Sequence, residues 1–438
     1  MAETAVSVAP YWELTFDADG DADPRRRERF LAEAVRRGVR DLVVFAHGWN
    51  SDRSAATRLY SRFLEPFPGL APDAVLGYAG VVWPSMRFSD EPIPDFPRAL
   101  AADGPARPAL GKDTRHALLE TFPGRATVVE QLARLLDRQS REEAELEEFG
   151  RLVRLLVEVV PPGPQGPFAA DTEAEGVPQS EPGMFSAPVA EVCEDFARAL
   201  ALCGTPPGAA SFSVPNPWDG AHELLRQATY YAMKRRAGTV GERGLGRLIG
   251  QLAAVAPGVR VHLVGHSFGA RLVSFALRGL PKGVHSVKSV TLLQGAFSHY
   301  AFAARLPHDP RAGGVLHGQD KRVDGPLVCC HSRHDSALGT IYPLASRMAG
   351  HDREVTGFDL GRSLGPRWGA LGHDGIQAVP GTRVCTLDDA VAGRIPASGC
   401  VNVDVASVVR RGGPPAGAHS DIVHRELAQV VVAAGRIR

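Results

Sequence analysis

Residues 261–270 read Val-His-Leu-Val-Gly-His-Ser-Phe-Gly-Ala, a glycine–serine–glycine turn between two regular elements. The run 259–264 predicts a buried strand, and 268–280 predicts a helix. A G-x-S-x-G sequence in this context turns sharply, because its glycines carry no side chain, and it holds the serine in a strained conformation above the start of the helix. We therefore expect Ser267 to be a nucleophile; a purely structural turn is the alternative.

Asp335 is the carboxylate that we expect to work with this serine. A serine hydroxyl needs a general base, and the base needs a carboxylate that orients it. Asp335 lies just beyond a predicted strand at 327–330 and before a helix expected from about 336. Asp324 precedes that strand and Asp404 lies within the last predicted strand, so both are weaker candidates.

His419 is the expected base. It follows a Gly/Pro-rich loop and directly precedes a predicted C-terminal helix at 421–434. His424 is the alternative, but its position in the sequence places it inside that helix. Ser420 or Asp421 is expected to cap the helix, since short polar side chains accept hydrogen bonds from the first turn.

A second loop is expected to stabilise the oxyanion that forms when a serine attacks a carbonyl group. The apolar run 42–46 predicts a buried strand, and His-Gly-Trp follows it. The backbone N–H groups of Trp49 and Phe268 are the expected donors to the oxyanion. His47 and His266 could instead be metal ligands, but we favour His47 packing beneath the loop and predict no metal.

The order of elements along the chain predicts an α/β fold in a single domain over residues 1–438. Strands and helices alternate along 10–87 and again along 220–438, which favours a parallel sheet with right-handed crossovers. The intervening segment 88–218 is interpreted as an insertion. Its apolar-striped helical part, 127–160, is expected to cap the serine, and its Pro/Gly/acid-rich part, 161–188, to be a flexible surface loop. Packing of the insertion on a remote edge is the alternative.

Composition sets the broad class of the protein. The 438 residues are 44% hydrophobic and 22% charged, which excludes a mainly disordered chain. The 49 basic and 49 acidic residues balance, so the net charge does not indicate a nucleic-acid partner. There is no run of about 20 apolar residues, no signal-peptide pattern at the start and no CxxC pair, so we expect no integral membrane contact and a cytoplasmic location.

The four motifs together resemble the α/β-hydrolase superfamily, and the resemblance covers 10–87 and 220–438. It implies a mainly parallel sheet with helices on both faces and a large helical insertion. Two features depart from the commonest pattern: the carboxylate sits in a histidine-rich HSRHD run, and the insertion follows the fourth strand rather than the sixth. Position by position, the resemblance implies Ser267 as nucleophile, Asp335 as acid, His419 as base, and Trp49 and Phe268 as oxyanion donors.

The resemblance is to bacterial serine esterases and lipases, and it implies hydrolysis of a carboxylic ester or thioester through an acyl-enzyme, without a cofactor. A small-molecule acyl substrate is the expected partner. Aromatic residues near the serine are expected to form its pocket, although they are equally typical of a core. A peptidase or amidase with the same triad is one alternative, and a catalytically silent scaffold that binds partners through 88–218 is another. The expected substrate-binding residues are Trp49, Phe297 and Tyr300.

Overall fold

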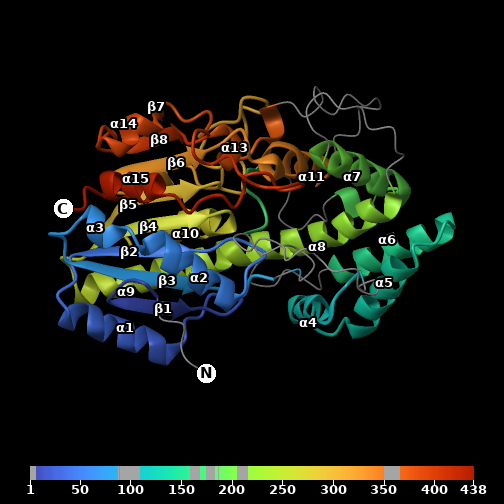
Figure 1. Ribbon diagram of the computed structural model, residues 1–438, viewed down its shortest axis with the longest axis horizontal. Helices are drawn as coiled ribbons and strands as arrows, with labels where there is room; N and C mark the ends of the chain where they lie inside the picture. Colours follow the sequence, from blue (N-terminus) through green and yellow to red (C-terminus); the bar gives the residue numbers. More distant parts are fainter. Residues whose placement is uncertain are drawn as a thin grey trace.

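A single sheet of eight parallel strands organises the computed structural model, which describes residues 6–86, 88, 109–157, 168–173, 183–185, 187–204, 216–349 and 366–438. The strand order is β1-β3-β2-β4-β5-β6-β8-β7 (Figure 1). The α/β class expected from the sequence is confirmed. The strands are β1 (Tyr11–Thr15), β2 (Asp41–Ala46), β3 (Leu76–Val82), β4 (Arg260–His266), β5 (Val287–Leu293), β6 (Pro326–His331), β7 (Arg383–Thr386) and β8 (Gly399–Asp404).

Helices cover both faces of the sheet. Successive side chains of a strand point to opposite faces, so each strand contributes to the core on both sides. In β2, Val43 and Phe45 join the core on the side of α2, α3, α14 and α15, whereas Leu42 and Val44 join the core shared with α1, α8, α9 and α10. The helices are α1 (Pro24–Arg36), α2 (Arg53–Leu64), α3 (Phe67–Leu70), α4 (Lys112–Thr121), α5 (Ala126–Arg138), α6 (Glu143–Val157), α7 (Val189–Gly204), α8 (Pro217–Thr239), α9 (Gly246–Val255), α10 (Phe268–Gly279), α11 (Tyr342–Ala349), α13 (Leu371–Asp374), α14 (Leu387–Val391) and α15 (Arg425–Gly435).

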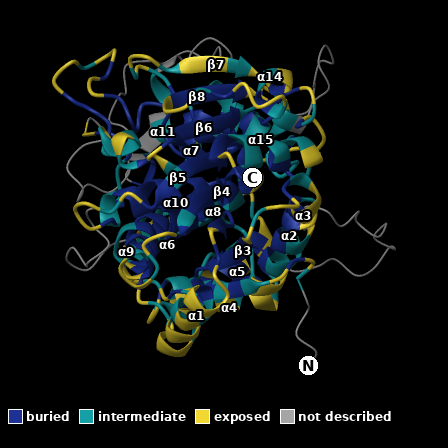
Figure 2. Ribbon diagram, turned by 90° about the vertical axis from the view of Figure 1, so that its left-hand side faces the viewer, coloured by how far each residue is buried: buried dark blue, intermediate teal, exposed yellow. Residues whose placement is uncertain are grey.

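The outer strand β7 has no counterpart among the predicted elements. It has four residues, its side chains are mostly exposed, and Val384 is 77% exposed. Figure 2 shows the central strands β4, β5 and β6 in the buried colour and β7 largely in the exposed one. A strand with so little burial lacks the apolar alternation by which strands are recognised in a sequence.

The described helices of the insertion lie past the carboxyl ends of the strands. They follow β3, the third strand along the chain, so the prediction that the insertion follows the fourth strand is wrong. Figure 1 shows α4 to α7 grouped at that end, with α8 running from the group back to the sheet. Their apolar faces share one continuous core with the sheet, to which Leu132, Phe149 and Leu263 all belong. None of the helices in the described ranges is long and apolar enough to cross a membrane.

The segment predicted to be a flexible surface loop, 161–188, lies mostly outside the described residues. Where residues 168–173 are described, the prediction is wrong, because Phe168 and Asp171 are buried. The Asp171 carboxylate pairs with the Arg271 guanidinium at 2.9 Å and with the Lys234 ammonium at 3.0 Å. Composition alone marks an aspartate as a surface residue; the basic partners that allow its burial come from distant helices.

Candidate active site

Ser267 occupies the one-residue turn between β4 and α10, in the strained conformation expected of it. Its φ is 55° and its ψ is −120°, a region that costs a non-glycine residue about 1–3 kcal/mol. Both flanking glycines are required by close contacts. A Cβ atom on Gly265 would lie 2.3 Å from the Gly269 carbonyl oxygen, and one on Gly269 would lie 2.0 Å from that of Ala46. The turn is therefore compact enough to lift the serine above the end of the sheet.

The three residues expected to form a triad are brought together from separate segments of the chain. The His419 Nε2 atom lies 2.9 Å from the Ser267 Oγ, and the His419 Nδ1 atom lies 2.7 Å from Asp335 Oδ2. A carboxylate only accepts hydrogen bonds, so Nδ1 carries the proton and Nε2 is left to accept one from the serine hydroxyl. This is the protonation pattern that a general base needs.

Asp335 is fixed by the helical turn that begins after it. Its side chain is fully buried, and its second oxygen accepts a hydrogen bond from the Leu338 N–H at 3.0 Å, in the π-helical turn Ala337–Ile341. The two other carboxylates considered from the sequence are engaged elsewhere: Asp324 pairs with Lys288, and Asp404 accepts a hydrogen bond from a backbone N–H two residues on. Asp335 is thus the carboxylate that the fold delivers to His419.

The loop that carries His419 is closed by Asp421. One carboxylate oxygen accepts hydrogen bonds from the backbone N–H groups of Arg410 and Arg411, at 3.0 and 2.8 Å, and the other lies 2.9 Å from the His424 Nε2 atom. The prediction that Asp421 or Ser420 caps the last helix is wrong, since α15 begins only at Arg425. His424, expected within that helix, is its N-cap residue.

The loop after β2 lies directly against the nucleophile. A Cβ atom on Gly48 would stand 2.7 Å from the Ser267 Cβ, so only glycine fits. Within the described part of the chain, the backbone N–H groups of Trp49 and Phe268 donate no hydrogen bond to protein groups. These are the two donors expected to face an oxyanion, and both remain available to a ligand.

His47 packs beneath this loop, as expected. Its ring stacks on Trp83 with centroids 5.5 Å apart, its backbone N–H donates to the Tyr60 hydroxyl, and its carbonyl accepts from the Trp83 indole N–H at 3.0 Å. Burial lowers the pKa of His47 to about 4, which keeps the ring neutral. Over the described ranges, no group of three or more His, Cys, Asp or Glu side chains is arranged to hold a metal ion.

His266 is a residue whose place in the site the sequence did not disclose. It was considered as a metal ligand, but its Nε2 atom lies 2.8 Å from the carbonyl oxygen of His419. The ring is buried, and burial, with smaller contributions from His419 and His47, lowers the pKa of His266 to about 3. Its position next to the serine in the motif was the available signal.

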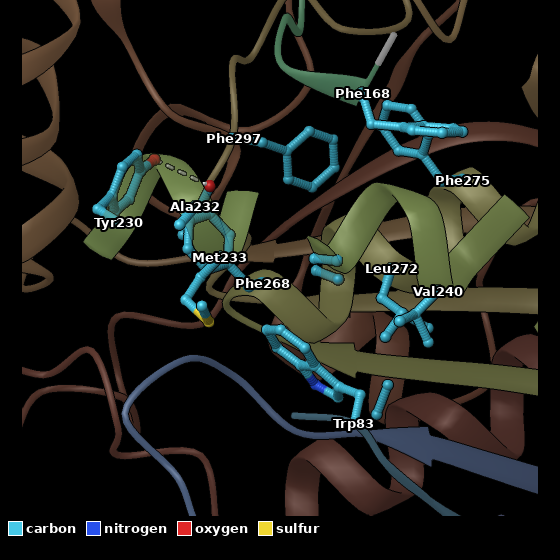
Figure 3. Packing of buried hydrophobic residues seen from close by; sticks show 14 of the residues in the cluster. Trp83, Phe168, Tyr230, Ala232, Met233, Val240, Phe268, Leu272, Phe275 and Phe297 are labelled. Atoms are coloured by element: carbon cyan, nitrogen blue, oxygen red, sulfur yellow. Dashed lines mark hydrogen bonds between the residues drawn. The ribbon is translucent and has the colours of Figure 1, made fainter. Parts of the chain in front are cut away.

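Aromatic side chains from three elements pack beside the nucleophile. The Trp49 ring contacts Phe268 and Tyr230. The rings of Tyr230 and Phe268 have centroids 4.7 Å apart. Figure 3 shows these two side chains next to each other. Tyr230, on α8, was missed because a helix that is buried on most sides shows no single apolar face. Of the other predicted pocket residues, Phe297 is fully buried in the core, and Tyr300 forms one wall of a small pocket with Ser298, Tyr342 and Trp368 among others.

The hydrogen-bonded chain from Ser267 to Asp335 is the most chemically specific feature of this molecule. It lies at the carboxyl ends of β4, β6 and β8, where parallel sheets generally bind ligands. No family model matches the sequence, and no curated protein or solved structure matches it either.

Proposed function

We propose that the protein is a serine hydrolase of the α/β-hydrolase type that cleaves a small carboxylic ester or thioester through an acyl-enzyme. The observation that carries this proposal is the hydrogen-bonded chain Ser267–His419–Asp335, set on a strained serine turn. Backbone strain of this kind clusters at active sites, and a histidine that can accept the serine proton is what a serine nucleophile requires.

In the proposed reaction, His419 accepts the Ser267 proton as the hydroxyl oxygen attacks the substrate carbonyl. Asp335 stays ionised, holds the imidazole in place and stabilises its charged form. The N–H groups of Trp49 and Phe268 stabilise the negative charge on the carbonyl oxygen. His419 then protonates the leaving group, and a water molecule activated by the same histidine releases the acid from the serine.

The arrangement of the sheet supports the assignment to this superfamily. The nucleophile, the acid and the base follow β4, β6 and β8 in chain order, which is the order of the triad in α/β-hydrolases. The HSRHD run and an insertion placed after β3 depart from the commonest pattern, so the class of acyl group is not assigned from the resemblance.

The helices of the insertion are proposed to cap the site. Tyr230 of α8 packs on Phe268, next to the nucleophile, and α8 also packs against α7 and α6. Phe88, at the start of the insertion, contacts Trp49. The Phe88 contact joins the insertion to the loop after β2, and α8, which directly follows the insertion, brings Tyr230 against Phe268.

Two alternatives use the same fold. A peptidase would need subsites for a chain on either side of the scissile bond, and no motif marks such subsites; an amidase is separated from an esterase by the anilide comparison below. A silent scaffold would have no use for a histidine hydrogen-bonded to a strained serine. Neither alternative is favoured by a specific observation.

The test is covalent labelling by a fluorophosphonate, followed by peptide mapping of the adduct. We expect one adduct, on Ser267, that forms in the folded protein and not after denaturation. A chain-length series of p-nitrophenyl esters, with matching anilides, then compares ester and amide turnover. Absence of labelling together with absence of ester turnover would exclude the proposed chemistry, and anilide turnover as fast as ester turnover would favour an amidase.

A further inference from the structure

The backbone of His419 is tied to the residue that precedes the nucleophile. The His266 Nε2 atom lies 2.8 Å from the His419 carbonyl oxygen, and the two rings lie 5.2 Å apart. His266 ends β4 and is held in register with Leu293 of β5, so it belongs to the rigid centre of the sheet. His419 belongs to a loop without regular structure. The contact joins the least regular member of the triad to the most rigid part of the fold.

The chemistry of this hydrogen bond is set by the acceptor. A carbonyl oxygen only accepts, so the Nε2 atom of His266 must carry the proton. In a neutral ring the Nδ1 atom is then unprotonated, and it lies close to Gly48, where an added Cβ atom would stand 3.3 Å from it. Burial keeps the ring neutral, with a pKa lowered to about 3. A neutral neighbour matters because His419 becomes positively charged when it takes the serine proton, and a charged His266 would oppose that step.

Other backbone hydrogen bonds in the described part of the chain hold the loop that carries His419, but they do not reach the nucleophile side of it. Ala418 donates its N–H to the His334 carbonyl at 2.9 Å, next to Asp335, which fixes the loop on the acid side. The N–H of His419 itself makes a long contact of 3.4 Å to Ala416. The His266 bond is the anchor on the nucleophile side, and it acts on the same residue whose ring must reach Ser267.

We propose that His266 is a positioning residue: it holds the His419 main chain where the His419 ring lies at hydrogen-bonding distance from the Ser267 hydroxyl. The inference rests on the proposed hydrolase function, since it assigns His266 a role in the reactivity of the triad. His266 touches neither the substrate nor the reacting atoms in this role. It acts through the base, so its loss affects the chemical step more than substrate binding.

The first test compares two substitutions. His266→Leu removes the donor, and His266→Gln keeps an N–H group near the position of Nε2. We expect His266→Leu to lower kcat for p-nitrophenyl acetate and the rate of fluorophosphonate labelling by about 10–100-fold, because misplacement of a catalytic group by about 1 Å costs that much. KM should stay within about twofold, and His266→Gln should recover most of the lost rate.

A second measurement needs no variant. Long-range ¹⁵N–¹H NMR of the histidine rings should show His266 as the neutral Nε2–H form throughout pH 5 to 8, in the range where unperturbed histidine titrates at about 6.5. An Nδ1–H form, or a charged ring in that range, would overturn the proposal whatever the variants do. This measurement also covers the case in which His266→Leu does not fold.

The outcomes separate this inference from the proposed function. If wild-type protein neither labels nor turns over an ester, the hydrolase function fails. If the wild type is active and His266→Leu is folded and equally fast, the positioning role fails while the function stands. A parallel loss in both variants, with KM raised and thermal stability lowered, would also overturn the positioning role, because it would show that the ring acts by packing alone.

Discussion

The pair His419–Asp335 and the pair His299–Asp374 are built alike and differ in what faces the second ring nitrogen. In each, a histidine Nδ1 atom meets a carboxylate, at 2.7 Å in the first and 3.1 Å in the second. The Nε2 atom of His419 meets the Ser267 hydroxyl. The Nε2 atom of His299 is buried and has no hydrogen-bond partner among the described residues.

The carboxylates differ as well. Asp335 is fully buried and serves one histidine, whereas Asp374 is partly exposed and shares its oxygens between His299 and His373. A histidine–aspartate pair is thus not enough to define a site. What distinguishes the His419 pair is the strained Ser267, at the end of β4, whose hydroxyl lies 2.9 Å from the second ring nitrogen. The predictions below test whether that difference decides reactivity.

The largest effect is expected from Ser267→Ala. Loss of a triad nucleophile costs about a millionfold in kcat, because the remaining triad members have nothing to activate. Thermal unfolding should be unchanged, since alanine fits the same tight turn. Stopped assays with a p-nitrophenyl ester, together with fluorophosphonate labelling, measure the loss. A folded variant that retained activity would remove Ser267 from the mechanism.

The next largest effect is expected from Asp335→Asn. An amide in place of the carboxylate favours the wrong histidine tautomer, and the corresponding change in other triads costs about 10⁴-fold in kcat. Asp374→Asn is the matched control and should leave kcat close to the wild-type value. If Asp374→Asn or Asp404→Asn were the damaging substitution and Asp335→Asn were silent, the acid would be misassigned.

A smaller effect is expected on stability, from the pair His373–Asp374. Burial acts to raise the pKa of Asp374, but hydrogen bonds from His299 and His373 outweigh it and hold this pKa below its ordinary value. The hydrogen bond to Asp374 raises the pKa of His373. The carboxylate therefore stabilises the fold above its unfolded pKa and loses that contribution as the pH falls. The imidazolium contributes below its unfolded pKa and loses that contribution as the pH rises.

Asp374→Asn should accordingly lower Tm by roughly 1–3 °C, most strongly between about pH 4 and pH 6.5, the unfolded values of the two groups. The Tm difference between wild type and variant should shrink on either side of that window. Differential scanning calorimetry across pH 3 to 9 measures it. A Tm difference that grows steadily toward alkaline pH would contradict the assigned shifts.

The smallest effect is expected from Ser298→Ala, which removes the hydroxyl next to His299. The Ser298 Oγ accepts a hydrogen bond from the Tyr300 N–H at 3.2 Å, so the variant should lose about 1 kcal/mol of stability. Ester turnover and labelling should not change. A large loss of activity would show that the second pair takes part in the reaction and would remove the distinction drawn above.

The geometry around Ser267 could be predicted from the sequence because its signals are local. The turn at Ser267 is contained in ten consecutive residues, and Asp335 and His419 each follow a strand that can be recognised. The contact between His299 and Asp374 joins residues 75 positions apart, from loops without periodicity, so no local pattern marks it. The same holds for His266: the motif places it beside the serine, but its partner is a carbonyl group, which every residue has.

The cluster of Asp171, Arg271 and Lys234 determines how much of the chain could be removed without loss of the fold. Arg271 is fully buried one turn after Ser267, and the carboxylate that neutralises it belongs to the insertion. A version without residues 88–218 would lose the carboxylate that pairs with Arg271 and Lys234, and removing one partner of a buried ion pair costs about 3–5 kcal/mol. The insertion is therefore not a detachable module, and a designer who removes it must also replace Arg271 and Lys234 with apolar residues.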